Sequence, residues 1–128
     1  ISPDGNYTVE NEANLDVFDE DTLRTYIKKW ADWSKSTGTP IMCNEFGVPV
    51  SLSEKARIAY MRSVLELFKE YGISWSIYTN GWQCWTPAVA DDNVKIGGTV
   101  LPADGSLTLS NGFWYDAEML KLFREYMK

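Results

Sequence analysis

The stretch Pro40-Ile41-Met42-Cys43-Asn44-Glu45-Phe46-Gly47 decides how the rest of this chain is interpreted. It is a short apolar run that ends in one carboxylate followed by a glycine. Its composition predicts a buried strand over residues 41–46 with alternating faces. A carboxylate at the end of a buried strand carries a desolvation cost unless it is paired. Glu45 is therefore the first candidate for chemistry, and a strand-end acid satisfied by a neighbour is the alternative.

A helix is predicted on the N-terminal side of this strand. Acidic residues from Asp19 onward fit a first helical turn, and Gly38 and Pro40 are placed to end the helix. Apolar residues recur at helical spacing and predict one buried, aromatic-rich face: Leu23, Tyr26, Ile27, Trp30 and Trp33.

A second helix is predicted after the strand. Ser51 and Glu54 have the S-x-x-E spacing of a capping box, and Gly72 is placed to cap the other end. The apolar stripe of this helix is Ile58, Met61, Val64, Leu65 and Phe68. A second strand is predicted over residues 73–79, with Trp75 on its apolar face.

The chain from residue 80 to residue 112 is predicted to be a long loop that carries short strands. Asp104-Gly105 is a turn signal before an apolar segment at residues 107–109. Asp116 can cap a last helix whose buried face includes Phe123. Residues 1–18 combine Pro, Asn and Gly with little periodicity and are expected to form an arm or loop.

Strands that alternate with helices predict an α/β fold with parallel pairing. We expect a single domain over residues 1–128, with the alternation confined to residues 19–128. The chain has 128 residues, whereas a full (β/α)8 barrel needs about 250. The expected fold is therefore a partial (β/α)8 barrel with about two parallel strands, three helices and a loop that bears a β-hairpin.

Composition and charge exclude several classes of function. The net charge of -6 argues against nucleic acid or an anionic membrane as a partner, and a neutral sugar is compatible with it. No apolar run approaches the length of a membrane span. The absence of His removes the serine triad and His-based metal sites. Asp91-Asp92 is a poor cation signal, so we expect neither a metal nor a cofactor.

Two cysteines are too few for a disulfide framework. Cys43 lies inside the predicted strand, so it and Cys84 are expected to be free thiols. The chain opens at Ile1 without a start methionine or a signal-peptide pattern. We expect an excised piece or a mature product.

The chain contains the run TPIMCNEFGV, and its second predicted helix ends in FKEYGISWSIYTNGW. Together these two runs resemble the C-terminal third to quarter of glycoside hydrolase family 5, the cellulase-type (β/α)8 barrels. The resemblance covers residues 19–128 and implies that the two predicted strands are barrel strands seven and eight. It implies that Glu45 is the catalytic nucleophile of a retaining endo-β-1,4-glucanase. It also implies a secreted or extracellular parent enzyme.

The resemblance also implies sugar-binding residues after strand eight. Tyr78 stands where the family has a Trp that stacks on the sugar, and Trp82 and Trp85 are nearby substitutes for that role. Asn80 is a plausible hydrogen-bonding partner for sugar hydroxyls. Most other aromatic residues, including Trp30, Trp33, Trp75, Phe68 and Phe123, are expected in the core.

The acid/base of the resembled family is missing from this chain. Retaining hydrolysis needs a second carboxyl about 5–5.5 Å from the nucleophile. In the family it is the Glu of an N-E-P motif, and neither Asn11-Glu12 nor Asn44-Glu45 is followed by Pro. A symmetry copy or an acid such as Asp91 or Asp92 could approach Glu45 only in an oligomer. The isolated chain is expected to be inactive or weakly active.

Three interpretations stay open from the sequence. The chain is a fragment of a hydrolase that acts on β-linked polysaccharide, a non-catalytic carbohydrate-binding module, or a structural half-barrel that self-associates. Two strands alone leave unpaired backbone edges, which oligomerisation relieves. We therefore expect a homo-oligomer, a dimer or larger.

Overall fold

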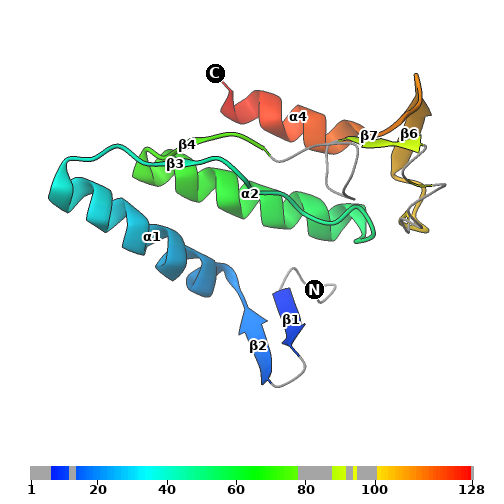
Figure 1. The fold of residues 1–128 in the computed structure, drawn as a ribbon. Helices are drawn as coiled ribbons and strands as arrows, with labels where there is room; N and C mark the ends of the chain where they lie inside the picture. The colour runs from blue at the N-terminus through cyan, green and yellow to red at the C-terminus, as the bar shows by residue number, and fades with distance from the viewer. Residues whose placement is uncertain (1–6, 12–13, 78–87, 92–93, 95–100, 128) are drawn as a thin grey trace.

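Three helices form the framework of the described part of the chain. The structure is a computed structural model and describes residues 7–11, 14–77, 88–91, 94 and 101–127. Within these ranges the helices are α1 (Glu20–Thr37), α2 (Glu54–Tyr71) and α4 (Ala117–Tyr126). Helix α2 lies between α1 and α4 (Figure 1). None of the described helices combines the length and hydropathy needed to cross a membrane.

The ends of the helices follow local capping chemistry. The Asp19 carboxylate accepts a hydrogen bond from the Thr22 N–H at 2.8 Å at the start of α1, and Gly38 ends this helix with φ 68°. Gly72 ends α2 in the same left-handed conformation, with φ 67°. Asp116 caps α4 through the Met119 N–H at 2.9 Å. These predicted starts and stops are confirmed.

The predicted capping box at α2 is wrong by two residues. Ser53, not Ser51, is the N-cap, and its hydroxyl accepts from the Ala56 N–H at 3.4 Å. The Glu54 N–H is instead bonded by the Asp104 carboxylate at 2.8 Å. A distant side chain therefore satisfies a helix N–H group that the sequence pattern assigned to a local partner.

The two predicted strands pair in parallel, but the buried strand predicted over residues 41–46 is only two residues long, and Met42 in it is 57% exposed. Strand β3 (Met42–Cys43) lies beside β4 (Ser74–Trp75), in register Met42 with Ser74 and Cys43 with Trp75. The Ser76 N–H donates to the Cys43 carbonyl at 2.9 Å, one residue beyond β4. Helix α2 connects the two strands, so the α/β unit with a parallel strand pair is confirmed.

A three-stranded antiparallel sheet follows in the chain, in the order β5 (Ala88–Ala90), β7 (Phe113–Asp116), β6 (Leu107–Ser110). The hairpin turn between β6 and β7 is Asn111-Gly112, with φ 50° and 78°, and not Asp104-Gly105 as expected. Positive φ at both central residues is the requirement of a two-residue hairpin turn, which Asn-Gly meets. The predicted β-hairpin in this part of the chain is confirmed.

The N-terminal segment forms a hairpin of its own. Strands β1 (Tyr7–Asn11) and β2 (Asn14–Phe18) pair antiparallel, with Tyr7 opposite Phe18. This hairpin lies at the N-terminal end of α1 (Figure 1). It occupies most of the segment that was expected to be an arm or loop.

Helix α2 supplies the centre of the core. Its apolar stripe contacts α4 on one side, where Met61, Leu65 and Met119 are fully buried. On the other side Val64 and Phe68 pack against Leu23 of α1. The predicted core positions Phe68 and Phe123 are confirmed, each 5% exposed, and Trp75 packs against both clusters.

The prediction that Trp30 and Trp33 are core residues is wrong. Their exposed fractions are 58% and 46%, and that of Tyr26 is 61%. Helix α1 turns Leu23, Ile27 and Ala31 toward α2. At about 100° per residue, Tyr26 and Trp33 lie to one side of this stripe, whereas Trp30 lies two turns beyond Leu23 on nearly the same side. The helical period was right, but the described residues cover this side of α1 at Leu23 and not at Trp30.

A fully buried ion pair joins α2 to α4. Arg57 Nε donates to Asp116 Oδ2 at 2.9 Å, and both side chains are 0% exposed. The remaining guanidinium nitrogens donate to the carbonyls of Val50 and Leu52 and to the Ser106 hydroxyl. Asp116 uses its second oxygen to cap α4. Every charged group in this network is therefore compensated.

We expect Asp116→Ala to lower the free energy of unfolding by about 3–5 kcal/mol, because it leaves the Arg57 guanidinium buried without its anion. Asp116→Asn keeps an oxygen for the α4 cap and separates the capping part of the loss from the charge part. The measurement is urea denaturation followed by circular dichroism. The matched control is Glu125→Ala, which breaks the exposed Arg62–Glu125 pair and should cost far less. Equal losses from the two alanine variants would contradict the central role of the buried pair.

Asp104 holds the start of α2 from the loop before β6. Its carboxylate accepts from the Ser106 hydroxyl and N–H and from the Glu54 N–H. These bonds hold the pKa of Asp104 at about 2, below the ordinary value of 3.8, and the bond from the Ser106 hydroxyl has the largest effect. The ionised form is therefore favoured by folding.

The contribution of Asp104 to stability should be present above pH 3.8 and be lost as the pH falls through about 2. We expect wild type to be more stable than Asp104→Asn at pH 5, with the difference shrinking toward pH 2. Chemical denaturation of both proteins across this pH range measures it. Asp21→Asn, at an exposed acid of the first turn of α1, is the control for general charge effects. A difference that is independent of pH would contradict the assignment.

Candidate functional site

Glu45 lies just beyond the C-terminal end of β3. Continuing the parallel register past Cys43 and Trp75 brings Glu45 level with Ile77. The two strands therefore end at the same edge of the sheet. In parallel α/β folds this edge is where ligands bind, because the strand ends and the loops that follow them meet there.

The residue after Glu45 fixes its position. The Phe46 ring packs edge to face against Phe68, at 5.2 Å between centroids, and against Trp75 at 5.7 Å. On the other side, the Cys43 thiol donates to the backbone carbonyl of Glu45 at 3.6 Å. The backbone of Glu45 is thus held by an aromatic anchor and a thiol, while its side chain is exposed.

The carboxylate of Glu45 makes no hydrogen bond or ion pair with any residue that the structure describes. The interpretation of Glu45 as an acid satisfied by a neighbour therefore finds no support in the described ranges. Burial raises the pKa of the neighbouring Cys43 thiol, which keeps it protonated and poor as a nucleophile. Cys43 is free, as expected.

Asp91 and Asp92 are the acids predicted to approach Glu45 in an oligomer. Asp91 Oδ1 accepts from Trp114 Nε1 at 3.0 Å, and the Asp91 N–H donates to the Gly112 carbonyl at 2.8 Å. These contacts tie Asp91 to the β6–β7 hairpin. Asp92 lies outside the described residues. A general acid/base for Glu45 thus stays unassigned.

The other predicted site residues, Tyr78, Asn80, Trp82 and Trp85, also lie outside the described residues, as does Cys84. Their proposed contacts with sugar stay predictions. Within the described ranges no cluster of three or more His, Cys, Asp or Glu side chains is placed to hold a metal ion.

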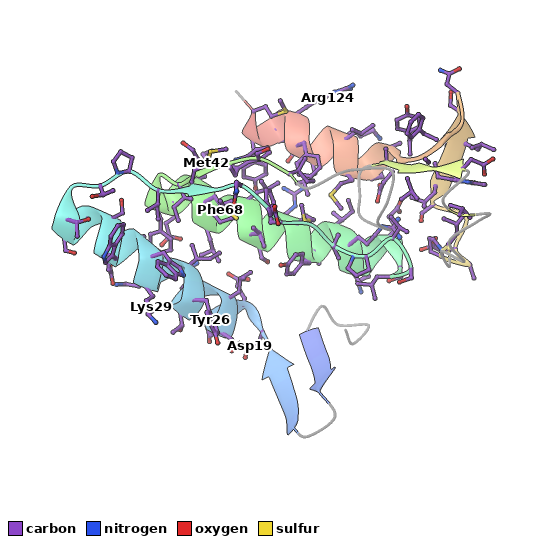
Figure 2. The ribbon with its side chains drawn as sticks, viewed as in Figure 1. Asp19, Tyr26, Lys29, Met42, Phe68 and Arg124 are labelled. Atoms are coloured by element: carbon purple, nitrogen blue, oxygen red, sulfur yellow. The ribbon has the colours of Figure 1, made fainter. Side chains whose placement is uncertain are left out.

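An apolar groove that sequence reasoning missed lies between α1, β3 and α2. Its volume is about 470 Å³, and its lining includes Tyr26 and Trp30 of α1, Met42 of β3 and the following Asn44, and Phe68 of α2. Figure 2 shows Tyr26, Met42 and Phe68 on these three elements. The signal in the sequence was the set of aromatic residues in the first helix, which were assigned to the core.

Comparisons with known proteins give short structural likenesses. No protein-family model matches the chain, and no curated protein sequence matches it. One similar solved structure is described as "endoglucanase": it is 25% identical, the match covers 52% of this chain and 24% of that one, and the TM-score is 0.44. Another is a hyperthermophilic endo-β-1,4-glucanase in complex with substrate, 23% identical, with 48% and 20% covered and a TM-score of 0.46. The chain thus spans about a quarter or less of these two proteins.

Proposed function

We propose that this chain is the nucleophile-bearing part of a retaining β-glycoside hydrolase of family 5, acting on a β-1,4-linked glucan. The observation that carries the proposal is the placement of Glu45. It is an exposed carboxylate at the C-terminal end of a parallel strand, held by the packed ring of Phe46 and without a partner among the described residues. The resemblance of the residues around it to the family supports the same role.

In the proposed reaction a Glu45 carboxylate oxygen attacks the anomeric carbon, and the glycosidic oxygen leaves with the bonding electrons. A glycosyl ester forms, and water then hydrolyses it. A natural sugar leaving group also needs a proton from a second carboxyl group. Since no such group is assigned in this chain, we propose that the parent enzyme supplies it and that the chain alone acts weakly or not at all.

The proposed substrate is an uncharged polysaccharide. Tyr78, Trp82 and Trp85 would stack on sugar rings and Asn80 would bond a hydroxyl, as the resemblance implies. The net charge of -6 is compatible with a neutral ligand and unfavourable for polyanions. Cellulose or mixed-linkage glucan is the first candidate and mannan the second, and the parent enzyme is proposed to be secreted.

The nucleophile can be tested without an acid/base. With 2,4-dinitrophenyl 2-deoxy-2-fluoro-β-cellobioside, dinitrophenolate leaves unprotonated, so only the attacking carboxylate is required. We expect one glycosyl adduct per chain by intact-mass spectrometry, mapped to the peptide that contains Glu45.

The control variants for labelling are Glu45→Gln and Glu118→Gln. The first should abolish the adduct, and the second, at an exposed acid of α4, should leave it unchanged. An adduct on another carboxylate, or labelling that survives Glu45→Gln, would remove Glu45 from the proposed role.

Sugar binding is tested separately from chemistry. We expect cellohexaose to change the tryptophan fluorescence of the chain in a saturable manner, and the double variant Trp82→Ala/Trp85→Ala to lose most of that change. Binding without labelling at Glu45 would favour the carbohydrate-binding module over the hydrolase fragment. Without any response at millimolar cellohexaose, both the module and the proposed sugar contacts would be wrong.

A further inference from the structure

The sheet formed by β5, β7 and β6 has two different faces. Successive residues of a strand point to opposite faces, and residues that pair across strands share one. On one face Val89, Leu107 and Asp116 are buried, and Val89 and Leu107 pack with Val50. The other face, here called the outer sheet face, consists of Ala88, Ala90, Thr108, Ser110, Phe113 and Tyr115. None of these six belongs to a hydrophobic cluster among the described residues.

Two aromatic rings lie next to each other on the outer sheet face. Phe113 and Tyr115 are two residues apart on β7, and their ring centroids are 6.1 Å apart with an angle of 48° between the ring planes. Phe113 is 41% exposed, and Tyr115 is partly exposed. An exposed ring suits a ligand that has an apolar side. A β-linked glucose unit has such a side, because its ring C–H groups project above and below the ring while its hydroxyls lie around the edge.

Each of the two rings has a hydroxyl side chain on one flank and a small side chain on the other. The strand register sets Thr108 of β6 opposite Tyr115 and Ser110 opposite Phe113, and both hydroxyl residues are exposed. On the β5 flank, Ala88 is opposite Tyr115 and Ala90 is opposite Phe113. A methyl side chain is too short to cover a neighbouring ring. The same arrangement of ring, hydroxyl and small residue therefore occurs twice along β7.

The outer sheet face is uncharged, although the chain carries a net charge of -6. Its six residues are Ala, Thr, Ser, Phe and Tyr in type, so an ionic ligand would find no counter-charge among them. A ligand that is neutral, apolar on one side and rich in hydroxyls at its edge matches both the rings and the side chains beside them.

We propose that the outer sheet face is an accessory sugar-binding site that holds a single β-glucan chain outside the site at Glu45. Phe113 and Tyr115 stack on two sugar rings of that chain, and Thr108 and Ser110 bond its hydroxyls. The ligand class rests on the proposed function, whereas the position and the residues of the site come from the sheet itself.

The sheet lies on the same side of the parallel pair as Glu45. Val50 belongs to the connection that follows β3, and Val89 and Leu107 belong to the connection that follows β4. Their contact shows that the two connections meet beyond the C-terminal ends of the strands. In a (β/α)8 barrel this end is the open face lined by loops, whereas neighbouring strands and helices pack along the sides. The outer sheet face therefore stays accessible when the chain is part of a whole barrel.

The angle between the two rings selects the form of the glucan. Planes inclined by 48° do not both lie flat against one planar surface, such as the face of a cellulose crystal. A single chain that is free to twist presents its successive sugar rings at an angle. The site therefore favours a soluble or amorphous glucan chain over crystalline cellulose.

Native affinity electrophoresis in gels that contain soluble mixed-linkage β-glucan tests the site. We expect the glucan to retard the wild-type chain. Phe113→Ala/Tyr115→Ala should weaken this binding by roughly tenfold or more, because two stacked rings are lost. The chain with Trp82→Ala/Trp85→Ala should still be retarded, since its outer sheet face is intact. In a sedimentation assay with microcrystalline cellulose the wild-type chain should stay in the supernatant.

The matched control is Leu109→Ala. Leu109 lies on β6 but on the opposite face from Phe113, and the two side chains are similarly exposed, at 46% and 41%. This variant should be retarded like wild type. Because the two alanine substitutions on β7 could unfold the sheet, Thr108→Val/Ser110→Ala is a second variant that keeps both rings and should weaken binding a few-fold. Circular dichroism melts establish which variants are folded.

The outcomes separate this site from the proposed function. A wild-type chain that is not retarded, or retardation that survives in folded forms of both the ring and the hydroxyl variants, would overturn the accessory site. Sedimentation with crystalline cellulose that depends on Phe113 and Tyr115 would overturn the selection of a single chain. Labelling of Glu45 in the wild-type chain reports on the proposed function alone. Retardation that depends on Phe113 and Tyr115 without labelling of Glu45 would leave the sugar site standing and remove the nucleophile.

Discussion

The buried Arg57–Asp116 ion pair is the constraint on which the rest of the structure depends. A guanidinium and a carboxylate removed from water are tolerated only when all their hydrogen-bonding groups find partners. Here the partners are spread over the loop before α2, the segment before β6 and the first turn of α4. The pair is therefore satisfied only when these three segments meet around Arg57 and Asp116. Replacing either member leaves the other buried and uncompensated.

The same network bears on the candidate site. The carbonyls of Val50 and Leu52 that Arg57 bonds belong to the segment that leads from Glu45 to α2. That segment is fixed at one end by Arg57 and at the other by Phe46, whose ring packs on Phe68 and Trp75. Glu45 lies directly before this segment, and its backbone is held by the Cys43 thiol and by the packed ring of Phe46 while its carboxylate stays exposed.

The sequence predicted correctly those helix ends that are set by residues close to them in the chain. Asp19, Gly72 and Asp116 act within a few residues of where they stand, and they were placed correctly. The parallel pair followed from the alternation of strands and helices. Ser51 failed because Asp104, fifty residues away, satisfies the Glu54 N–H instead. Asp116, the partner of Arg57, is fifty-nine residues away, and no periodic pattern in the sequence predicts this pair.

The aromatic residues show a different limit of the sequence. Periodicity reports that a helix face is apolar, but not whether the chain itself covers that face. Leu23 and Trp30 fit the same helical period, yet Leu23 is 6% exposed and Trp30 58%. For the site, the sequence singled out Glu45 because it closes the apolar run that contains β3, and its role stays a prediction. The contacts of Tyr78, Asn80, Trp82 and Trp85 depend on residues that the structure does not describe.

Helix α1 is attached to α2 through a small buried contact. Leu23 is its buried contact with α2, Ile27 and Ala31 are partly covered, and Arg24 reaches the Glu70 carboxylate on the exposed surface. An element with so few buried contacts opens locally at a lower free energy than the core around α2. Anything that binds the closed form of α1 stabilises it by mass action. The order of α1 is thereby linked to the concentration of whatever binds its exposed side, which carries Tyr26, Trp30 and Trp33.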